Sequence, residues 1–346
     1  PAPLKAVQFF GVLSGLACLL FAWLILRVCF KADYSAQLLG ICTVAFMPMM
    51  LYLNPAISNE TFAAAVISLS LYLLARYAFR DSVTVRQTVL LGASFGLALL
   101  SKYTALLVFV VAVGVLLLRL WVRPGQRRRE AATLLLFVLV VCLVCGWFYG
   151  RNAVLFHKPF IANWDEESGF IFEQPPGYRT AAFYLKFGSV FTRAPERSRW
   201  SSFWDGYYGS MWMDTHFNML DYKDGRADSL GTIILGLALL PSAAMLVGFI
   251  RSLQRVAACR QFGPDFALAA AVYGTMLMLV WYTLKIPYIT TLKAFYSLSL
   301  LPAFAVFAGF GLSEMARNLR KFSPLLYAGL LALFALIGHL FWYGRN

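Results

Sequence analysis

Long runs of apolar residues constrain this chain more than any other feature of its sequence. A helix that crosses a bilayer needs about 20 mostly apolar residues, because the hydrocarbon core is about 30 Å thick and a helix rises about 1.5 Å per residue. The runs that approach this length lie at about 7–30, 36–53, 61–78, 88–101, 104–119, 131–149, 229–250, 266–284, 294–312 and 324–343. The sequence therefore predicts an all-α, polytopic transmembrane helical bundle with about ten membrane segments.

The composition supports this fold class. Hydrophobic residues make up 60% of the chain and charged residues only 13%, whereas a soluble domain has about 45–50% and about 25%. Soluble globular and disordered classes are therefore excluded, and we expect an integral, multi-pass membrane protein. The short, adjacent segments 88–101 and 104–119 predict a hairpin that need not cross the membrane fully.

The basic residues predict the orientation of the bundle. Alternate connections and the helix ends beside them hold 16 of the 30 basic residues and five acidic ones, a net charge of +11, and the other side has a net charge of +3. By the positive-inside rule the more basic side faces the cytoplasm. The total charge of +14 thus reflects topology, so we expect no nucleic-acid partner. Binding of anionic lipids is the alternative role for the triplet Arg127–Arg129.

This orientation places Pro1 on the outside of the membrane. A first helix that starts outside usually follows an earlier helix, and the first apolar run is longer than the 7–15-residue core of a signal peptide. We therefore expect the complete protein to have sequence upstream of Pro1, so that this chain is N-terminally truncated.

One connection, residues 150–228, is far longer than the others and is rich in aromatic and acidic residues. Long loops inside compact proteins are usually functional. We expect three parts: an N-terminal transmembrane part (1–149), an extracytoplasmic loop (150–228) and a C-terminal transmembrane part (229–346). Within the loop, residues 180–191 predict a short amphipathic helix on the membrane surface.

Sequence patterns for metal, nucleotide or dinucleotide binding are absent. The three histidines, His157, His216 and His339, are too scattered for a metal motif, and neither a phosphate-binding P-loop nor a dinucleotide fingerprint occurs. We therefore expect no metal and no cofactor. Gly92 and Gly96 form a G-x-x-x-G pattern, which predicts close packing of one membrane helix against another.

Two polar clusters precede membrane segments on the predicted outer side. Asn59 and Glu60 lie before the third segment, where a carboxylate could bind a sugar hydroxyl. Helix capping and the helix dipole explain the same residues. Lys102 and Tyr103 lie at the apex of the predicted hairpin, where Lys102 is a candidate to bind an anion such as a lipid phosphate. Snorkelling to water is the alternative for Lys102.

A third cluster comprises Lys285, Lys293 and Tyr296, which flank the outer end of the ninth segment. These residues could bind a phosphate and a sugar ring, although anchoring of helix ends at the membrane interface also explains them. Pro302 lies within that segment and predicts a kink.

The fourth cluster lies in the long loop and combines rings with acidic residues and a histidine. Its members are Trp204, Asp205, Trp212, Asp214 and His216. Aromatic faces next to carboxylates are typical of sugar binding. An interfacial aromatic belt would explain the rings, but it would not need the two aspartates or the histidine.

Several of these residues resemble a known family. Asn54-Pro55, with Ser58-Asn59-Glu60 before the third segment, resembles the polytopic lipid-linked-sugar glycosyltransferases of the GT-C superfamily, in their protein-mannosyltransferase-like branch, glycosyltransferase family 39. The run from Gly96 to Thr104, which contains Ser101-Lys102-Tyr103, is similar to a pattern of that branch. Tyr296 to Pro302 resembles its late helix, but Phe295 stands where an arginine is common.

The resemblance implies an enzyme that transfers a sugar from a polyprenyl-phosphate-linked donor to an acceptor outside the cytoplasm, the acceptor being a lipid, a glycan or a protein. The partners would be membrane lipids, this donor and this acceptor. In the family the catalytic base is expected to be an aspartate in the first outside loop, which here would lie upstream of Pro1. Within this chain the base is unknown, with Glu60, Asp205 and Asp214 as candidates.

The reaction needs few protein groups. A carboxylate takes the proton from the acceptor hydroxyl, and cations stabilise the charge that develops on the departing lipid phosphate. Lys102, Lys285 and Lys293 are the candidate cations. The main alternative is a secondary transporter, or a protein that translocates lipids or lipid-linked sugars. Transporters carry ionisable residues deep in the bundle, whereas here such residues cluster at segment ends.

Overall fold

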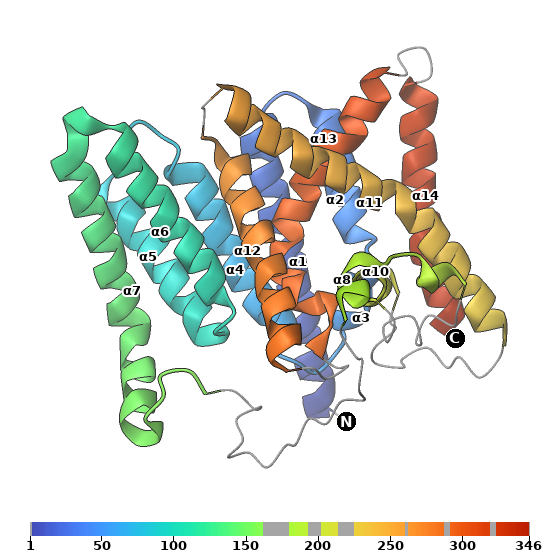
Figure 1. Cartoon of the computed structure of the whole chain (residues 1–346), viewed down its shortest axis with the longest axis horizontal. Helices are drawn as coiled ribbons and strands as arrows, with labels where there is room; N and C mark the ends of the chain where they lie inside the picture. Colours follow the sequence, from blue (N-terminus) through green and yellow to red (C-terminus); the bar gives the residue numbers. More distant parts are fainter. Residues whose placement is uncertain are drawn as a thin grey trace.

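The computed structural model describes residues 2–161, 180–192, 202–213, 225–259, 262–286, 291–318 and 323–345. Within these ranges the regular elements are all helices and there is no strand (Figure 1), which confirms the predicted all-α class. The long helices are α1 (Ala2–Phe30), α2 (Tyr34–Ala45), α4 (Glu60–Tyr77), α5 (Val85–Ser101), α6 (Ala105–Val122), α7 (Arg127–Phe156), α11 (Gly225–Cys259), α12 (Pro264–Lys285), α13 (Leu301–Asn318) and α14 (Ser323–Arg345). The short ones are α3 (Pro48–Leu53), η1 (Pro124–Gln126), α8 (Ala181–Leu185), η3 (Ser189–Phe191), α10 (Phe203–Trp212) and η5 (Ala294–Leu300), the three η elements being 3-10 helices.

Seven helical stretches in the described part of the chain are long and apolar enough to cross a membrane. They are α1, α6, α7, α11, α12, α14 and the continuous stretch of η5 and α13. The helix α11 has 35 residues, or about 52 Å, and it lies obliquely across the other helices in Figure 1. The protein is therefore an integral membrane protein.

The three other predicted segments are also helical. Segment 36–53 is divided into α2 and α3, because Met47 before Pro48 takes an extended conformation (φ −65°, ψ 121°), as residues before proline commonly do. Segment 61–78 is α4, which has Glu60 in its first turn and Arg76 in its last. Segment 88–101 corresponds to α5, a shorter apolar helix.

The kink predicted at Pro302 is replaced by a change of helix type. Residues Ala294–Leu300 form the 3-10 helix η5, and α13 starts at Leu301. Pro302 is thus the second residue of α13. The first four N–H groups of an α-helix have no partner within the helix, so the missing N–H of proline is tolerated there.

The helix α13 forms the centre of the bundle and is almost fully buried, with α1, α2 and α11 packed around it. Glycines permit backbone contact at these crossings. A Cβ on Gly311 would lie 1.9 Å from the carbonyl oxygen of Ala244 in α11, and one on Gly40 of α2 would lie 2.4 Å from that of Ala305. Small residues at such crossings are how membrane helices approach closely.

A second packing unit consists of α5, α6 and α7, at the left of Figure 1. A Cβ on Gly92 would lie 2.8 Å from the Cβ of Val140 in α7, and one on Gly96 would lie 2.5 Å from that of Val144. This confirms the helix packing predicted from the G-x-x-x-G pattern.

The connections gather at two opposite ends of the bundle. We call the end with the α1–α2, α4–α5 and α6–α7 connections the basic end. The loop end holds the α3–α4 connection, the α5–α6 turn, α8, α10 and the start of η5, and both chain termini lie on this lower side in Figure 1. The basic clusters predicted to lie on one side of the membrane therefore share one end of the bundle.

The long connection differs from its prediction in two respects. Its predicted bounds, 150–228, fall inside α7 and α11, which end at Phe156 and begin at Gly225. The predicted helix over 180–191 is wrong in extent, because only Ala181–Leu185 is α-helical. The chain then runs extended to Gly188, whose φ of 115° is a conformation that interrupts a right-handed helix.

Candidate functional site

An ion pair between Glu60 and Lys102 is the centre of the candidate site at the loop end. The Nζ atom of Lys102 lies 2.5 Å from both carboxylate oxygens of Glu60, and their side chains are 13% and 15% exposed. Two clusters that the sequence predicts separately, 42 positions apart, are thus joined by one largely buried contact.

The end of α5 determines where Lys102 lies. Its backbone N–H still donates to the carbonyl of Ala98 at 3.0 Å, but the residue itself is extended (φ −162°, ψ 132°). Its own carbonyl then accepts from the N–H of Ala105 at 3.0 Å, which closes a tight turn into α6. Lys102 therefore occupies the tip of a helical hairpin, and its side chain reaches across to α4.

The start of α4 determines where Glu60 lies. A carboxylate in the first turn of a helix is favoured by the helix dipole. The N–H of Glu60 donates to Ser58 Oγ at 3.4 Å, whereas the exposed side chain of Asn59 makes no capping hydrogen bond. Ser58 therefore bonds to the helix start and Asn59 does not, and Asn59 does not line the cavity described below.

Aromatic rings of η5 face Lys102. Its Nζ lies 5.4 Å from the ring centroid of Tyr296 and 5.8 Å from that of Phe295. Lys293 Nζ lies 5.1 Å from the Phe295 centroid. A cation within about 6 Å of a ring face is attracted by it. The structure therefore brings Tyr296 of the third predicted cluster next to Glu60 and Lys102, and it places Lys293 of the same cluster against the Phe295 ring. Sequence reasoning did not select Phe295, although its departure from the family pattern marked the position.

A small cavity lies among these residues. The space inside it is about 10 Å³, which is about the room that one water molecule needs. The polar residues that line it are Glu60, Lys102, Thr104, Tyr296 and Ser299. In this conformation the ion pair and the rings fill the site.

Two further predicted residues lie near this site but do not line the cavity. Partial burial, and then the nearby Tyr282 and Glu60, raise the pKa of Tyr103 above its ordinary value, so its hydroxyl remains a proton donor at neutral pH. Tyr103 is 45% exposed. Lys285 is the last residue of α12 and is exposed.

The helix α10 holds η5 in place. Ser210 Oγ accepts a hydrogen bond from the N–H of Ala294 at 2.9 Å, and the Tyr207 hydroxyl lies 2.6 Å from Ser297 Oγ. The Tyr52 hydroxyl of α3 donates to the carbonyl of Ser210 at 2.7 Å. Sequence reasoning missed these supporting residues, because their polar atoms meet partners that are 84 to 158 positions away.

Asp205 is fully buried and bonded to a neighbouring loop. Its carboxylate accepts hydrogen bonds from the backbone N–H of Gly188 at 2.7 Å and of Ser189 at 3.1 Å, and from the Ser189 hydroxyl. These bonds tie the segment after α8 to α10. Asp205 does not line the cavity of Glu60 and Lys102, and the structure gives it a role in closing the loop.

The two tryptophans predicted to stack on a sugar have different environments. Trp212 is 1% exposed and its indole N–H has no partner among the described residues, so it belongs to the core. Trp204 is 42% exposed and donates to the carbonyl of Tyr184 at 2.8 Å. Of these two rings only Trp204 offers a surface to a ligand. Asp214 and His216 lie outside the described residues.

No group of three or more histidine, cysteine or carboxylate side chains converges within the described ranges in a way that would hold a metal ion.

Comparison with solved structures finds proteins that share the fold of this chain. The chain aligns over 98% of its length with crystal structures of ArnT from Cupriavidus metallidurans, both in the apo state and bound to undecaprenyl phosphate, with a TM-score of 0.50 and 17% identity in each case. It spans 61% of the length of the ArnT chain. The chain therefore shares the fold of these ArnT structures, in agreement with the fold that the resemblance implies.

Comparison with protein families gives a match over the N-terminal part of the chain. Residues 3–147 match the family described as dolichyl-phosphate-mannose-protein mannosyltransferase, and this part of the chain contains both Glu60 and Lys102. In this part of the chain the match confirms the resemblance to the protein-mannosyltransferase branch. No curated protein matches the sequence.

Proposed function

We propose that this chain belongs to a membrane glycosyltransferase that takes a sugar from a polyprenyl-phosphate-linked donor and transfers it to an acceptor at the extracytoplasmic face. The observation that carries the proposal is the position of Lys102. It lies at the loop end, in the part of the chain that matches the family, and faces Glu60, Phe295 and Tyr296 in a largely buried site.

The proposal gives Lys102 the role of binding the donor phosphate. A phosphate oxygen and an ammonium form a short, charge-assisted hydrogen bond, and the phosphate would take the place that Glu60 occupies in the ligand-free site. ArnT has been crystallised with undecaprenyl phosphate, which supports a polyprenyl phosphate as the carrier of the sugar. Phe295 and Tyr296 would then border the bound sugar or the first isoprene unit.

The chemistry follows from this placement. The acceptor hydroxyl oxygen forms a bond to the anomeric carbon, and the bond from that carbon to the phosphate oxygen breaks. The phosphate leaves with the electron pair and gains negative charge, which Lys102 stabilises, with Lys293 as the second candidate. A carboxylate accepts the hydroxyl proton. Of the three candidate bases only Glu60 borders this cavity among the described residues, and its role as base stays a prediction.

The distribution of buried charges favours an enzyme over a transporter. The described charged residues that are buried lie near helix ends, as with Arg119 and Glu130 at the basic end and Asp205 in α10. A transporter places such residues near the bilayer midplane.

The proposal is tested by binding of undecaprenyl phosphate to the purified full chain in mixed micelles. We expect Lys102→Ala to weaken binding at least tenfold and Lys102→Arg to retain part of it. Lys186→Ala is the matched control, because Lys186 is an exposed lysine of the same end outside the cavity, and we expect it to stay within twofold of the parent chain. Undecaprenol, which lacks the phosphate, should bind all four proteins equally weakly.

Transfer of labelled mannose from undecaprenyl phosphate mannose is the second readout, with Lys102→Ala and Lys186→Ala compared at equal folded protein. Equal phosphate binding by the Lys102→Ala variant and the parent chain would overturn the proposed phosphate site.

A further inference from the structure

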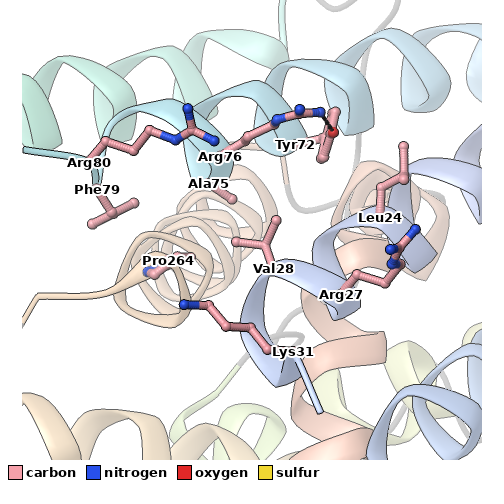
Figure 2. Close-up of a pocket in the computed structure, with 10 residues that line it drawn as sticks. All are labelled: Leu24, Arg27, Val28, Lys31, Tyr72, Ala75, Arg76, Phe79, Arg80 and Pro264. Carbon is pink, nitrogen blue, oxygen red and sulfur yellow. Dashed lines mark hydrogen bonds between the residues drawn. The ribbon is translucent and has the colours of Figure 1, made fainter. Parts of the chain in front are cut away.

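A second pocket lies at the basic end of the bundle, between α1, α4 and the start of α12 (Figure 2). Its volume is about 580 Å³, within the range of about 300–1,000 Å³ that is usual for ligand sites. Four cationic side chains border it, together with the rings of Tyr72 and Phe79: Arg27 in α1, Lys31 just after α1, Arg76 in α4 and Arg80 just after α4.

The register of the two helices gives the pocket an apolar floor and a cationic rim. Leu24, Arg27 and Val28 follow the spacing i, i+3, i+4, so they share one face of α1, and Lys31 comes directly after the last residue of that helix. On α4, Tyr72, Ala75 and Arg76 follow the same spacing, and Phe79 comes just after the helix ends at Tyr77. Both helices run from the loop end to the basic end, so the first lining residues, Leu24 and Tyr72, lie deeper in the bundle than the last ones, Lys31 and Arg80.

These cations have no acidic partner in the described part of the chain. None of the four forms an ion pair there, and no carboxylate lines the pocket. Arg76 donates to the hydroxyl of Tyr72 (Figure 2), and the guanidinium of Arg27 lies 5.0 Å from the ring of Trp23.

The acidic residues nearest in sequence do not line the pocket: Asp81 follows Arg80 directly and is exposed, and Asp33 and Asp265 are bonded elsewhere. Asp33 accepts from the N–H of Ala36 at 3.0 Å, where it caps α2, and Asp265 accepts from Ser252 Oγ at 3.1 Å. Pro264 brings the start of α12 to the edge of the pocket, and a helix start adds partial positive charge. The pocket is therefore a concentration of positive charge that an anion would neutralise.

We propose that this pocket binds the phosphate headgroup of an anionic phospholipid in the membrane leaflet at the basic end. The rim cations would hold the phosphate, and the acyl chains would follow Leu24, Val28 and Tyr72 toward the membrane interior. Basic pockets between membrane helices are known to bind such headgroups. The apolar floor favours a lipid over a soluble phosphate.

This site is distinct from the proposed donor site and does not depend on it. Arg76 follows Glu60 by 16 positions on α4, so the two sites are separated by about 24 Å along that helix. A basic end that only sets topology would need the charges but would not need them to converge on a pocket with an apolar floor.

The experiment titrates phosphatidylglycerol into the delipidated full chain in micelles. Native mass spectrometry then counts the lipid molecules that stay bound to each protein. We expect Arg27→Gln combined with Arg76→Gln to weaken binding at least tenfold, with phosphatidylcholine binding unchanged. The matched control is Arg86→Gln combined with Arg251→Gln, which removes the same charge from exposed positions that do not line the pocket. We expect it to stay within twofold.

Each other outcome is decisive. An equal loss in both double variants, or no loss in either, would overturn the pocket. If glycerol 1-phosphate displaced phosphatidylglycerol at a similar concentration, the pocket would bind a soluble phosphate equally well, and the proposal of a lipid ligand would be wrong. Should the pocket variant aggregate on size-exclusion chromatography, Lys31→Gln combined with Arg80→Gln replaces it, because both residues are exposed at the rim, and the same criteria apply.

Discussion

In the described part of the chain, each end of the bundle contains a buried or nearly buried ion pair that connects neighbouring helices, and the two pairs differ in how many partners the cation has. At the basic end, the Arg119 guanidinium contacts both oxygens of Glu130 at 2.7 and 2.8 Å and also donates to the carbonyls of Ala78 and Arg80. The side chains of Arg119 and Glu130 are 6% and 2% exposed. At the loop end, Lys102 has Glu60 and two aromatic rings.

The difference indicates which pair is structural and which is suited to binding. Arg119 reaches protein acceptors with each of its three guanidinium nitrogens and holds the α4–α5 connection against the α6–α7 connection. Lys102 has one carboxylate partner beside a small cavity, and in the proposed function a donor phosphate takes the place of that partner. The comparison suggests a simple rule: a cation with several protein acceptors is held in place, whereas a cation with a single acceptor is suited to bind a ligand.

The largest effect is expected from Glu130→Gln, which leaves Arg119 as a buried charge without its counter-ion. We expect a loss of about 3–5 kcal/mol in the free energy of unfolding, measured by reversible unfolding in mixed micelles. The double variant Arg119→Met, Glu130→Met removes both charges and should recover most of that loss. A loss below about 1 kcal/mol for Glu130→Gln would contradict the structural role that we assign to the ion pair of Arg119 and Glu130.

A smaller effect is expected from Asp205→Asn at the loop end, where a buried carboxylate is held by N–H groups and a hydroxyl. Hydrogen bonds to a charged group contribute about 1.5–3 kcal/mol, so we expect a loss of that order. We also expect faster proteolysis between residues 186 and 192. Asp81→Asn, at an exposed aspartate of the basic end, is the control. Unchanged stability with lost sugar transfer would instead make Asp205 catalytic.

Tyr207→Phe is expected to cost about 1 kcal/mol, because it removes one hydrogen bond, the bond to Ser297 that joins α10 to η5. Since η5 carries Tyr296, binding of undecaprenyl phosphate should weaken a few-fold. Tyr343→Phe changes a hydroxyl that is mostly exposed and should change neither quantity. Full binding by Tyr207→Phe would show that η5 does not need α10 for its position.

The smallest effect is expected for the coupling between Glu60 and Lys102 in the absence of ligand. A double-mutant cycle with Glu60→Gln and Lys102→Met should give a smaller coupling energy than the same cycle on Arg119 and Glu130, because the side chains of Lys102 and Glu60 are 13% and 15% exposed against 6% and 2%. A coupling as large as that of Arg119 with Glu130 would assign Lys102 a structural role.

The helices were predictable from the sequence because apolar run length is a local property. The helix contact made by Gly92 and Gly96 was predictable for the same reason. The pairing of Glu60 with Lys102 was not, because each lies in its own short connection and nothing local indicates that α4 and α5 bring them together. Both residues were nevertheless candidates, since each is a charge beside an apolar run.

The aromatic cluster of the long connection shows what sequence reasoning could not separate. Trp204 and Trp212 have the same chemistry and lie eight positions apart, yet one is 42% exposed and the other 1%. Burial of α10 depends on α3, α11 and η5, which are distant in the sequence. The sequence likewise made Asp205 a candidate base. Only the fold shows that its carboxylate is bonded to the N–H groups of Gly188 and Ser189.

The glycine contacts of α13 also have a mechanical consequence. Where a main chain lies directly on another main chain, as at Gly311 with Ala244 and at Gly40 with Ala305, there is no side chain that can change rotamer to absorb a displacement. Helices α2, α11 and α13 should therefore move as one rigid body. Seams packed by side chains, such as that between α4 and η5, can adjust by rotamer changes. Opening of the site around Lys102 is expected to occur along that seam while the central helices stay still.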